Sequence, residues 1–508
     1  MSLIKSLAKV SSFTLISRLL GFVRDLVLAH LFGADGKTDA FFVVFKIPNF
    51  MRRLFADGAF ANAFVPVLAE FRVKNSFAEL RLLVDRMAGT LGVTMLALTL
   101  FAVVATPLLV MLFAPGFIGY PDKQALTVEM LRLVFPYLLF ISLTAFAGSI
   151  LYAYNRFAVP AFTPVLLNLS LISCALWLSP QMTEPVVALA WGVLIAGVAQ
   201  LTFQLPFLNK LGLLPRPAID FSDPGVKRVF VLLGPALIGV SVTQINLLLD
   251  TLFATFLADG SVSWLYYSDR LMEFPLGVLG IALATVILPS LSHRHAQASP
   301  EGFSHAIDWG LRWVLLLGMP AGLGLLLLAE PIIATLFESP VFDAEDIMMA
   351  GRSLTAYALG LVGFIMVKVL APAFYARQDT RTPVRIAFIA LFANLLLNLV
   401  LMFPLAHAGL ALATTLSAML NALLLLRALR SQGIYTPVPG WSVRMLRVVI
   451  ACLVMAVLVI YGVSTGETWL EMARWERVWR LLLLIVTAAG GYLLTLILVG
   501  IRRRDFVE

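Results

Sequence analysis

The chain has 508 residues, of which 60% are hydrophobic and only 13% are charged, with a formal net charge of +8. Soluble domains carry about 25% charged residues, so the composition excludes a soluble protein and indicates a membrane protein that crosses the bilayer many times. The positive charge does not indicate nucleic acid binding, because most basic residues lie in short loops between apolar runs, as in the cytoplasmic loops of membrane proteins.

A helix needs about 20 mostly apolar residues to cross the hydrocarbon core. We therefore predict an all-α polytopic membrane protein with fourteen transmembrane helices. They cover, approximately, residues 8–32, 39–66, 82–113, 128–153, 160–179, 185–208, 228–257, 263–291, 309–337, 348–375, 384–404, 408–429, 444–464 and 477–501. The first run follows Lys5 and Lys9 but is long, contains charges and lacks a small-residue cleavage site, so it predicts a retained helix rather than a secretory signal.

Basic residues gather in alternate connections between these helices. The basic set comprises Arg72, Lys74, Arg81, Arg86, Arg156, Lys210, Arg216, Lys227, Arg228, Arg294, Arg377, Arg381, Arg385, Arg427, Arg430 and residues 502–504. The opposite connections are short and neutral or acidic, as at Asp259 and at residues 338–346. The asymmetry predicts that both termini are cytoplasmic, and an even number of helices agrees with it.

The two halves of the chain resemble each other at an offset near 223 residues. Pro160 and Pro383 are 223 residues apart, and so are Ala188 and Ala411. The repeat predicts an N-terminal lobe of six helices (1–210), a cytoplasmic linker (211–227), a C-terminal lobe of six (228–430) and a remainder with two helices (431–508). Parallel repeats of this kind are typical of secondary transporters that bind substrate between their halves.

The first predicted helix contains two arginines, Arg18 and Arg24. An arginine at the centre of such a helix costs roughly 2.5–3.5 kcal/mol. Arg18 shares a helix face with Asp25, whereas Arg24 lies about a third of a turn away. Either the helix bends near Gly21, or the two arginines have different roles.

The second and the eighth predicted helices also contain clusters of charge. In the second predicted helix, Asp39, Lys46 and Arg53 share a face. Arg52 lies about a quarter turn away, and a bend at Pro48 would bring it onto that face. Lys46 and Arg53 are also long enough to reach a membrane interface.

In the eighth predicted helix Asp269 and Glu273 are one turn apart, beside Arg270 and before Pro275. Cations exceed acids across these three helices, which predicts a hydrated cationic cavity that binds phosphate, since arginine forms bidentate phosphate contacts. The alternative is that the charges pair with one another and join helices.

Asp250 lies alone in the seventh predicted helix, while Asn394 and Asn398 are one turn apart in the eleventh and Thr414 lies in the twelfth. An acid with amide and hydroxyl oxygens could bind Na⁺, or the acid could carry a proton. Ordinary hydrogen bonding between helices is the alternative.

No motif indicates an enzyme. The run 33–38 (GADGKT) has two residues between its glycines where a Walker loop needs four, and the chain contains neither HExxH nor G-x-S-x-G. Cys174 and Cys452 lie in apolar segments and the five histidines show no ligand spacing. We expect no enzymatic activity and no cofactor.

Four charged motifs resemble those of the MurJ (MviN) family of lipid II flippases, and the similarity covers essentially the whole chain. They are residues 17–25 (SRLLGFVRD), 38–42 (TDAFF), 48–60 (PNFMRRLFADGAF) and 267–275 (YSDRLMEFP). The resemblance implies the fold of the multidrug/oligosaccharidyl-lipid/polysaccharide exporter superfamily: two pseudo-symmetric six-helix lobes around a cationic cavity. It also implies that the two helices of 431–508 line a groove for an undecaprenyl tail.

The resemblance further implies roles for individual residues. The substrate-binding residues that we predict are Arg18, Arg24, Asp25, Asp39, Arg52, Arg53, Asp269, Arg270 and Glu273. Positions resembling a sodium site of some members are Asp250, Asn394, Asn398 and Thr414. Because Asn398 stands where those members can have Asp, one formal charge is missing, and Na⁺, H⁺ and the membrane potential all remain open as the energy source.

We therefore predict a flippase that moves lipid II, the undecaprenyl-pyrophosphate-linked disaccharide-pentapeptide, from the inner to the outer leaflet of a bacterial cytoplasmic membrane by alternating access. Arg24, Arg52 and Arg270 would hold the pyrophosphate while Arg18 shapes the field, and direct contact is predicted above all for Arg24. We expect a monomer in membrane lipid, with cell-wall synthesis proteins as candidate partners.

Three alternatives remain open at the level of the sequence. The chain could transport another polyprenyl-pyrophosphate-linked saccharide, which shares the same anionic group. It could be a drug or metabolite antiporter of the same fold, although such a cavity would have acids in excess. It could also be a scaffold for cell-wall assembly that transports nothing.

Overall fold

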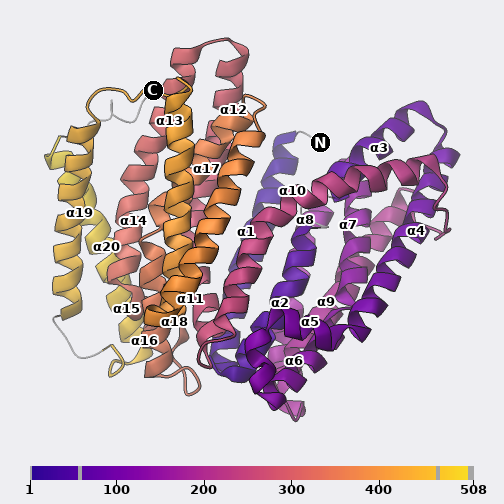
Figure 1. Ribbon diagram of the computed structural model, residues 1–508, viewed down its shortest axis with the longest axis horizontal. Helices are drawn as coiled ribbons and strands as arrows, with labels where there is room; N and C mark the ends of the chain where they lie inside the picture. The colour runs from indigo at the N-terminus through magenta and orange to yellow at the C-terminus, as the bar shows by residue number, and fades with distance from the viewer. Residues whose placement is uncertain (1–2, 55–59, 465–468, 501–508) are drawn as a thin grey trace. The chain divides into compact units, whose positions relative to one another are not determined.

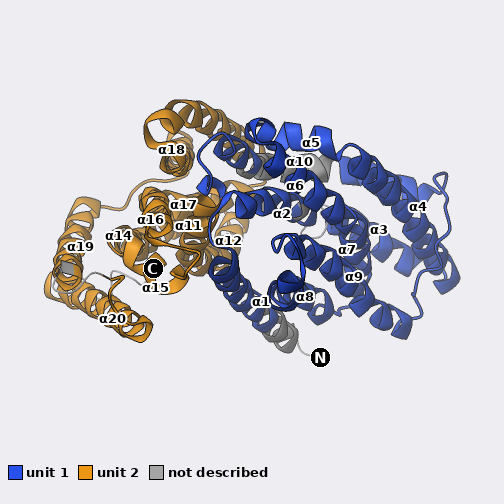
Figure 2. Ribbon diagram, turned by 90° about the horizontal axis from the view of Figure 1, so that it is seen from below, with its two compact units in different colours: residues 1–262 blue, residues 263–508 orange. Residues whose placement is uncertain are grey.

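The structure, a computed structural model, describes residues 3–54, 60–464 and 469–500, with the backbone alone at 3–11, 48, 54, 235–247 and 464. Apart from an isolated bridge between Ser339 and Phe342, these residues form helices, turns and coil. The prediction of an all-helical chain is confirmed for them. The chain divides into two compact units, residues 1–262 (unit 1) and 263–508 (unit 2) (Figure 2).

Unit 1 consists of ten α-helices among its described residues, joined by short turns (Figure 1). They are α1 (Leu3–Phe32), α2 (Gly36–Leu54), α3 (Phe60–Lys74), α4 (Phe77–Val104), α5 (Thr106–Phe113), α6 (Pro121–Val134), α7 (Tyr137–Ala153), α8 (Ala158–Ser173), α9 (Val187–Lys210) and α10 (Pro224–Ala254). Shorter turns of helix are η2 (Pro115–Gly119), η3 (Cys174–Leu178) and η4 (Ser179–Gln181). Helix α1 packs along α8, which in turn packs against α9.

Unit 2 begins within the first turn of α11 and ends with a pair of helices that pack on each other, α19 and α20 (Figure 1). Its helices are α11 (Ser261–Pro275), η5 (Leu276–Gly280), α12 (Ile281–Ala296), α13 (Pro300–Trp313), η6 (Val314–Gly318), α14 (Met319–Leu327), α15 (Ala329–Phe337), α16 (Ala344–Ala358), α17 (Leu361–Tyr375), α18 (Arg381–Ser431), α19 (Trp441–Ser464) and α20 (Arg474–Leu498).

Nine helices of the described part of the chain are long and apolar enough to cross a membrane, or ten if α16 and α17 form one bent span. The chain is thus a polytopic membrane protein. Helices α1 and α2, which each contain five Lys, Arg, Asp or Glu residues, are not among these candidates.

Proline interrupts several of the predicted spans. The span predicted at 82–113 is broken at Ala105, two residues before Pro107, and the span at 128–153 is broken next to Pro136. Proline lacks the N–H that a helix interior needs, so each helix ends and restarts there. Residues 55–59, within the span predicted at 39–66, lie outside the described residues.

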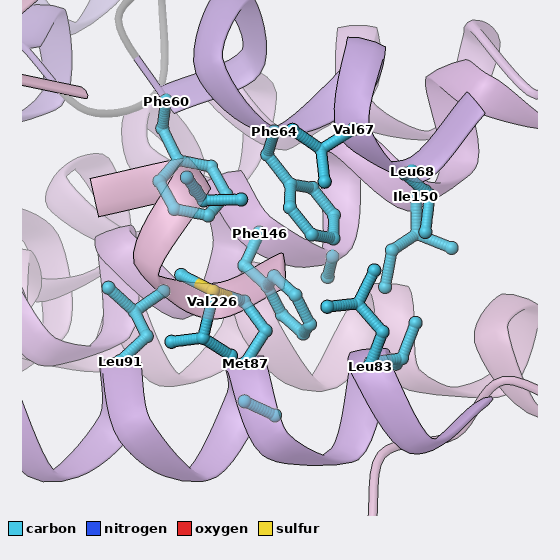
Figure 3. Packing of buried hydrophobic residues seen from close by; sticks show 14 of the residues in the cluster. Phe60, Phe64, Val67, Leu68, Leu83, Met87, Leu91, Phe146, Ile150 and Val226 are labelled. Carbon is cyan, nitrogen blue, oxygen red and sulfur yellow. The ribbon is translucent and has the colours of Figure 1, made fainter. Parts of the chain in front are cut away.

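The core of unit 1 lies where α3, α4, α7 and α10 meet (Figure 3). Phe60 and Phe64 of α3 converge there on Phe146 of α7, with ring centroids 5.2–6.2 Å apart. Val226, near the start of α10, completes this cluster. Helix α10, which the repeat assigns to the second half of the chain, is therefore packed within unit 1.

The linker predicted at 211–227 is helix-free over 211–223, where it runs over the side of α4, whereas its last four residues already belong to α10. A Cβ on Gly89 of α4 would lie 2.2 Å from the carbonyl oxygen of Ala218, so only glycine fits beneath this segment. Arg86 donates a hydrogen bond to Asp223 at 2.6 Å, and Asp223 caps α10. Burial raises the pKa of the Asp223 carboxyl, but hydrogen bonds from Val226 and Arg86 outweigh it and hold the pKa below its ordinary value.

The spans predicted at 384–404 and 408–429 correspond to the two arms of α18, which meet at a sharp kink. Ala406 adopts φ 48° and ψ −130° there, a left-handed conformation that strains a residue with a Cβ. A Cβ on Gly409 would lie 2.1 Å from the carbonyl oxygen of Leu401, so the close approach of the two arms requires glycine.

The pair α19 and α20 packs on α14 and α15 through an apolar cluster that includes Leu328, Met455 and Leu484. In the widened turn η6, the carbonyl of Leu316 lies four residues before Pro320, which has no N–H to donate to it. The hydroxyl of Tyr492 on α20 donates to this carbonyl at 2.7 Å. Helix α20 is therefore joined to η6 by a hydrogen bond at a carbonyl for which Pro320 offers no backbone donor.

Candidate functional site

The structure places the predicted site residues on five helices. Those of unit 1 are Arg18, Arg24 and Asp25 on α1, Asp39, Arg52 and Arg53 on α2, and Asp250 on α10. Those of unit 2 are Asp269, Arg270 and Glu273 on α11, and Asn394, Asn398 and Thr414 on α18.

Arg24 is 4% exposed and is held by groups from three helices. Its Nε and Nη2 donate to Oδ1 of Asp25 at 2.9 and 2.6 Å, and its Nη1 donates to Oδ1 of Asn168 on α8 at 3.1 Å. The guanidinium also lies 5.2 Å from the ring centroid of Phe45 on α2. A buried arginine of this kind is stable only with its counter-ion close by, and Asp25, itself 2% exposed, supplies it.

Arg18 lies six residues, about 1.7 turns, earlier on α1 and is exposed. Helix α1 is continuous from Leu3 to Phe32, across Gly21. Of the two possibilities that the spacing left open, a bend near Gly21 or different roles, the second agrees with this geometry: Arg24 is enclosed and Arg18 is not.

Asp39 lies in the first turn of α2 and is 1% exposed. It accepts a hydrogen bond from the backbone N–H of Gly260 at 2.8 Å, and Nζ of Lys123 lies 3.6 Å from its carboxylate. Lys123 also pairs with Asp259 at 2.7 Å and lies 4.1 Å from the ring centroid of Phe117. Asp39 thus joins α2 to α6 and to the start of α11.

The arginines of α2, Arg52 and Arg53, are half-buried in its last turn. A helix rises about 1.5 Å per residue, so the backbone of Arg52 lies roughly 20 Å from that of Asp39. The shared face that periodicity predicts therefore extends along the length of α2. Its acidic and basic ends do not form one cluster.

On α11, Arg270 pairs with Glu273 one turn further on. Nη1 of Arg270 donates to Oε2 of Glu273 at 2.8 Å, and the guanidinium lies 5.2 Å from the ring centroid of Tyr266. The two side chains are 30% and 40% exposed, respectively. The pair is thus local and much more open than the pair of Arg24 with Asp25.

The amide cluster of α18 links the two arms of that helix. Asn398 donates to Oδ1 of Asn394 at 3.0 Å, and Asn394 donates to Oγ1 of Thr414 at 3.2 Å. Asp250 lies in unit 1 and is 8% exposed. Among the described residues, no group of three or more His, Cys, Asp or Glu is placed to hold a metal ion. The coupling ion stays a prediction.

Two of the residues that contact the predicted site were missed by sequence reasoning. Asn168 was unremarkable as one amide in an apolar helix, 144 residues from its partner Arg24. Lys123 lies at the start of α6, and nothing in its surroundings pointed to Asp39. Only the packing of α8 on α1 and of α6 on α2 brings these pairs together.

Known proteins share both the sequence and the fold. A family profile described as "Lipid II flippase MurJ" matches residues 28–478. A "Probable lipid II flippase MurJ" of Vibrio cholerae is 47% identical over 99% of this chain and 97% of its own length. A "Lipid II flippase MurJ" of Burkholderia cenocepacia is 45% identical over 90% of this chain and 89% of its own length.

Solved structures agree with the sequence comparison. The structure titled "Lipid II flippase MurJ, inward closed conformation" has a TM-score of 0.81 and 26% identity, and covers 96% of this chain and 97% of its own. An inward-facing multidrug transporter of the MATE family is similar in fold alone, with a TM-score of 0.65 and 14% identity over 84% of this chain and 98% of its own. The chain therefore belongs to the MurJ family of lipid II flippases, which are transporters and not enzymes.

Proposed function

We propose that this protein moves lipid II from the inner to the outer leaflet of a bacterial cytoplasmic membrane. The observation that carries the proposal is the family match, which spans residues 28–478 and includes relatives 44–47% identical over most of the chain. The presence of arginines in α1, α2 and α11 supports it, because a pyrophosphate is the part of lipid II that arginine recognises best.

Arg24, Arg52 and Arg270 bind the pyrophosphate in this proposal, and Arg18 adds to the positive field. The state of Arg24 supports a mechanism of exchange between anions. Asp25 neutralises Arg24 while no head group is bound, which makes a buried arginine tolerable. A head group would then compete with Asp25 for the guanidinium, and return of Asp25 would favour release into the outer leaflet.

Alternating access completes the cycle: the helices rock about the bound head group, so that it faces first the cytoplasm and then the outside. Such a change needs the substrate to bind the two states with different affinity. In this proposal an anion that exchanges with Asp25 provides that difference, because Arg24 holds the head group in one state and Asp25 in the other.

The undecaprenyl tail stays in lipid along α19 and α20 in this proposal. Both helices expose large apolar side chains, among them Leu453, Val457, Leu483 and Val486. Helix α20 is fixed to the end of α15, since Arg477 of α20 is 5% exposed and donates to Glu338 at 3.0 Å. A firmly packed pair with an apolar outer surface suits a polyprenyl chain.

We further propose fourteen transmembrane helices, at the residue ranges and in the lobes that the sequence predicts. In this proposal both termini lie in the cytoplasm, and the protein is a monomer in the inner membrane. Single cysteines test the topology. Ser222→Cys in the linker should react with a thiol reagent only after the membrane is opened, and Val341→Cys should react in intact cells. Both positions are exposed. The opposite labelling would contradict the proposed orientation.

Growth of cells that depend on the protein tests the function. Arg270→Ala should abolish growth while the protein still inserts at normal abundance, because the pyrophosphate loses one of its arginines. The matched control is Arg352→Ala, which removes an exposed arginine of α16 that contacts the sulfurs of Met348 and Met349. Normal growth on Arg270→Ala would contradict the pyrophosphate role and would favour a scaffold that transports nothing.

A further inference from the structure

Asn168 of α8 contacts α1 at two points that are seven residues apart. Its Nδ2 donates to the backbone carbonyl of Ser17 at 3.0 Å, and its Oδ1 accepts from Nη1 of Arg24 at 3.1 Å. Seven residues are nearly two full turns, so both points lie on the same side of the helix. Asn168 is 6% exposed, and its amide spans the interface of α1 and α8.

The chemistry of the two contacts determines the orientation of the amide. A guanidinium only donates hydrogen bonds and a backbone carbonyl only accepts them. The oxygen of Asn168 must therefore face Arg24 and its nitrogen must face Ser17. A carboxylate at this position could not donate to Ser17, and an apolar side chain could contact neither group through a hydrogen bond.

The neutral charge of Asn168 matters as much as its shape. Arg24 already has a carboxylate partner, since Nε and Nη2 both donate to Oδ1 of Asp25. A second carboxylate on Nη1 would give the cluster a net negative charge and repel an anionic ligand. The amide fixes the plane of the guanidinium from another side and adds no charge.

From this geometry we infer that Asn168 is a positioning residue for Arg24: it ties the guanidinium to the backbone of α1 so that its donor groups are already oriented when the pyrophosphate arrives. Arginine has large rotamer entropy, and a guanidinium fixed in advance loses less freedom on binding a phosphate. The inference rests on the proposed function, because it assigns to Asn168 an effect that reaches the head group only through Arg24.

The binding of lipid II to the purified full-length protein tests this inference, with a double-mutant cycle as the readout. Asn168→Leu, of similar size and without polar atoms, should weaken lipid II affinity about tenfold, the worth of one hydrogen bond to a charged group. Arg24→Ala should weaken it further. In the Arg24→Ala background, Asn168→Leu should have no additional effect, because the residue through which Asn168 acts is gone.

A matched control separates positioning from helix packing. Ser170, also on α8, donates to the carbonyl of Gly192 at 2.7 Å and so joins α8 to α9. Ser170→Ala removes a hydrogen bond between helices as Asn168→Leu does, and both should lower the melting temperature slightly. Only Asn168→Leu should change lipid II affinity.

A second variant keeps the test informative if Asn168→Leu accumulates poorly. Asn168→Asp should still accept a hydrogen bond from Arg24, but its carboxylate gives the cluster a net negative charge that repels the pyrophosphate. The affinity for lipid II should therefore fall, while the melting temperature stays at or above that of Asn168→Leu. A merely structural role would move both readouts together.

The outcomes separate the inference from the proposed function. Unchanged lipid II affinity in Arg24→Ala would overturn the role of Arg24 in head-group binding, and the role of Asn168 with it. Affinity lost in Arg24→Ala but kept in Asn168→Leu and Asn168→Asp would overturn the role of Asn168 alone. An equal loss from Asn168→Leu with and without Arg24 would show that Asn168 acts by another route, and would also overturn the inference.

Discussion

Arg24 of unit 1 and Arg270 of unit 2 are both arginines in largely apolar helices, yet the groups that hold them differ. The side chain of Arg24 is 5% exposed and has a partner 144 residues away in the chain, besides its neighbour Asp25. The side chain of Arg270 is 30% exposed and pairs with Glu273 one turn away on the same helix. The comparison indicates that α1 encloses its arginine among groups of three helices, whereas the pair of Arg270 with Glu273 on α11 is partly open to solvent.

The largest effect should come from Asp25→Ala. This change leaves the buried guanidinium of Arg24 without its carboxylate, and breaking one side of a buried ion pair costs about 3–5 kcal/mol. We expect a sharply lower melting temperature and lower abundance in the membrane. A melting temperature equal to that of the parent protein would show that the Arg24 environment is not the enclosed one described here.

Arg24→Lys should have an intermediate effect on function. Lysine keeps the charge but not the planar donor groups that contact Asp25 and Asn168 together. We expect lipid II affinity to fall roughly tenfold, the equivalent of one charge-assisted hydrogen bond at about 1.5 kcal/mol, and growth to be partly supported. Full support of growth by Arg24→Lys would mean that charge alone matters at this position.

Tyr492→Phe tests a long-range contact without charge. It removes the hydroxyl that donates to the carbonyl of Leu316 and should lower stability by about 1 kcal/mol. Thermal unfolding of the purified protein measures this. An unchanged melting temperature would indicate that the apolar cluster alone holds α20 in place, and that another group satisfies the carbonyl of Leu316.

The smallest effect should come from Glu273→Gln. The side chains of Arg270 and Glu273 are 30% and 40% exposed, so solvent screens the pair. It should contribute about 0.2–1 kcal/mol to the free energy of unfolding, which thermal unfolding of the purified protein measures. The effect should also shrink as salt is raised, unlike that of Asp25→Ala. A loss of stability as large as that of Asp25→Ala would contradict the distinction between the two arginines.

Local sequence patterns predicted most of the fold. Apolar runs located the helices, and the kink at Ala406 falls between two spans that hydrophobicity had already separated. The breaks at Ala105 and Pro136 were missed because apolar residues continue on both sides of the prolines. An apolar run reports burial in lipid or protein, but it does not report where the backbone restarts.

The candidate site was predictable only where its contacts are local. The pair of Arg270 with Glu273 follows from a spacing of three residues on one helix. Periodicity also indicated that Arg18 and Arg24 cannot be equivalent on a straight helix, and the structure places one exposed and the other enclosed. The contacts of Asn168 and Lys123 depend on how helices far apart in the chain pack, which no periodicity records.

The most direct test of the central claim, that buried and half-buried arginines hold the pyrophosphate of lipid II, is the movement of lipid II across the bilayer of vesicles that contain the purified protein. A reagent that cannot cross the membrane would report the lipid II that reaches the outer leaflet. We predict that the parent protein and Arg352→Ala move lipid II, and that Arg24→Ala combined with Arg270→Ala does not. Equal rates for the double variant and the parent would contradict the account.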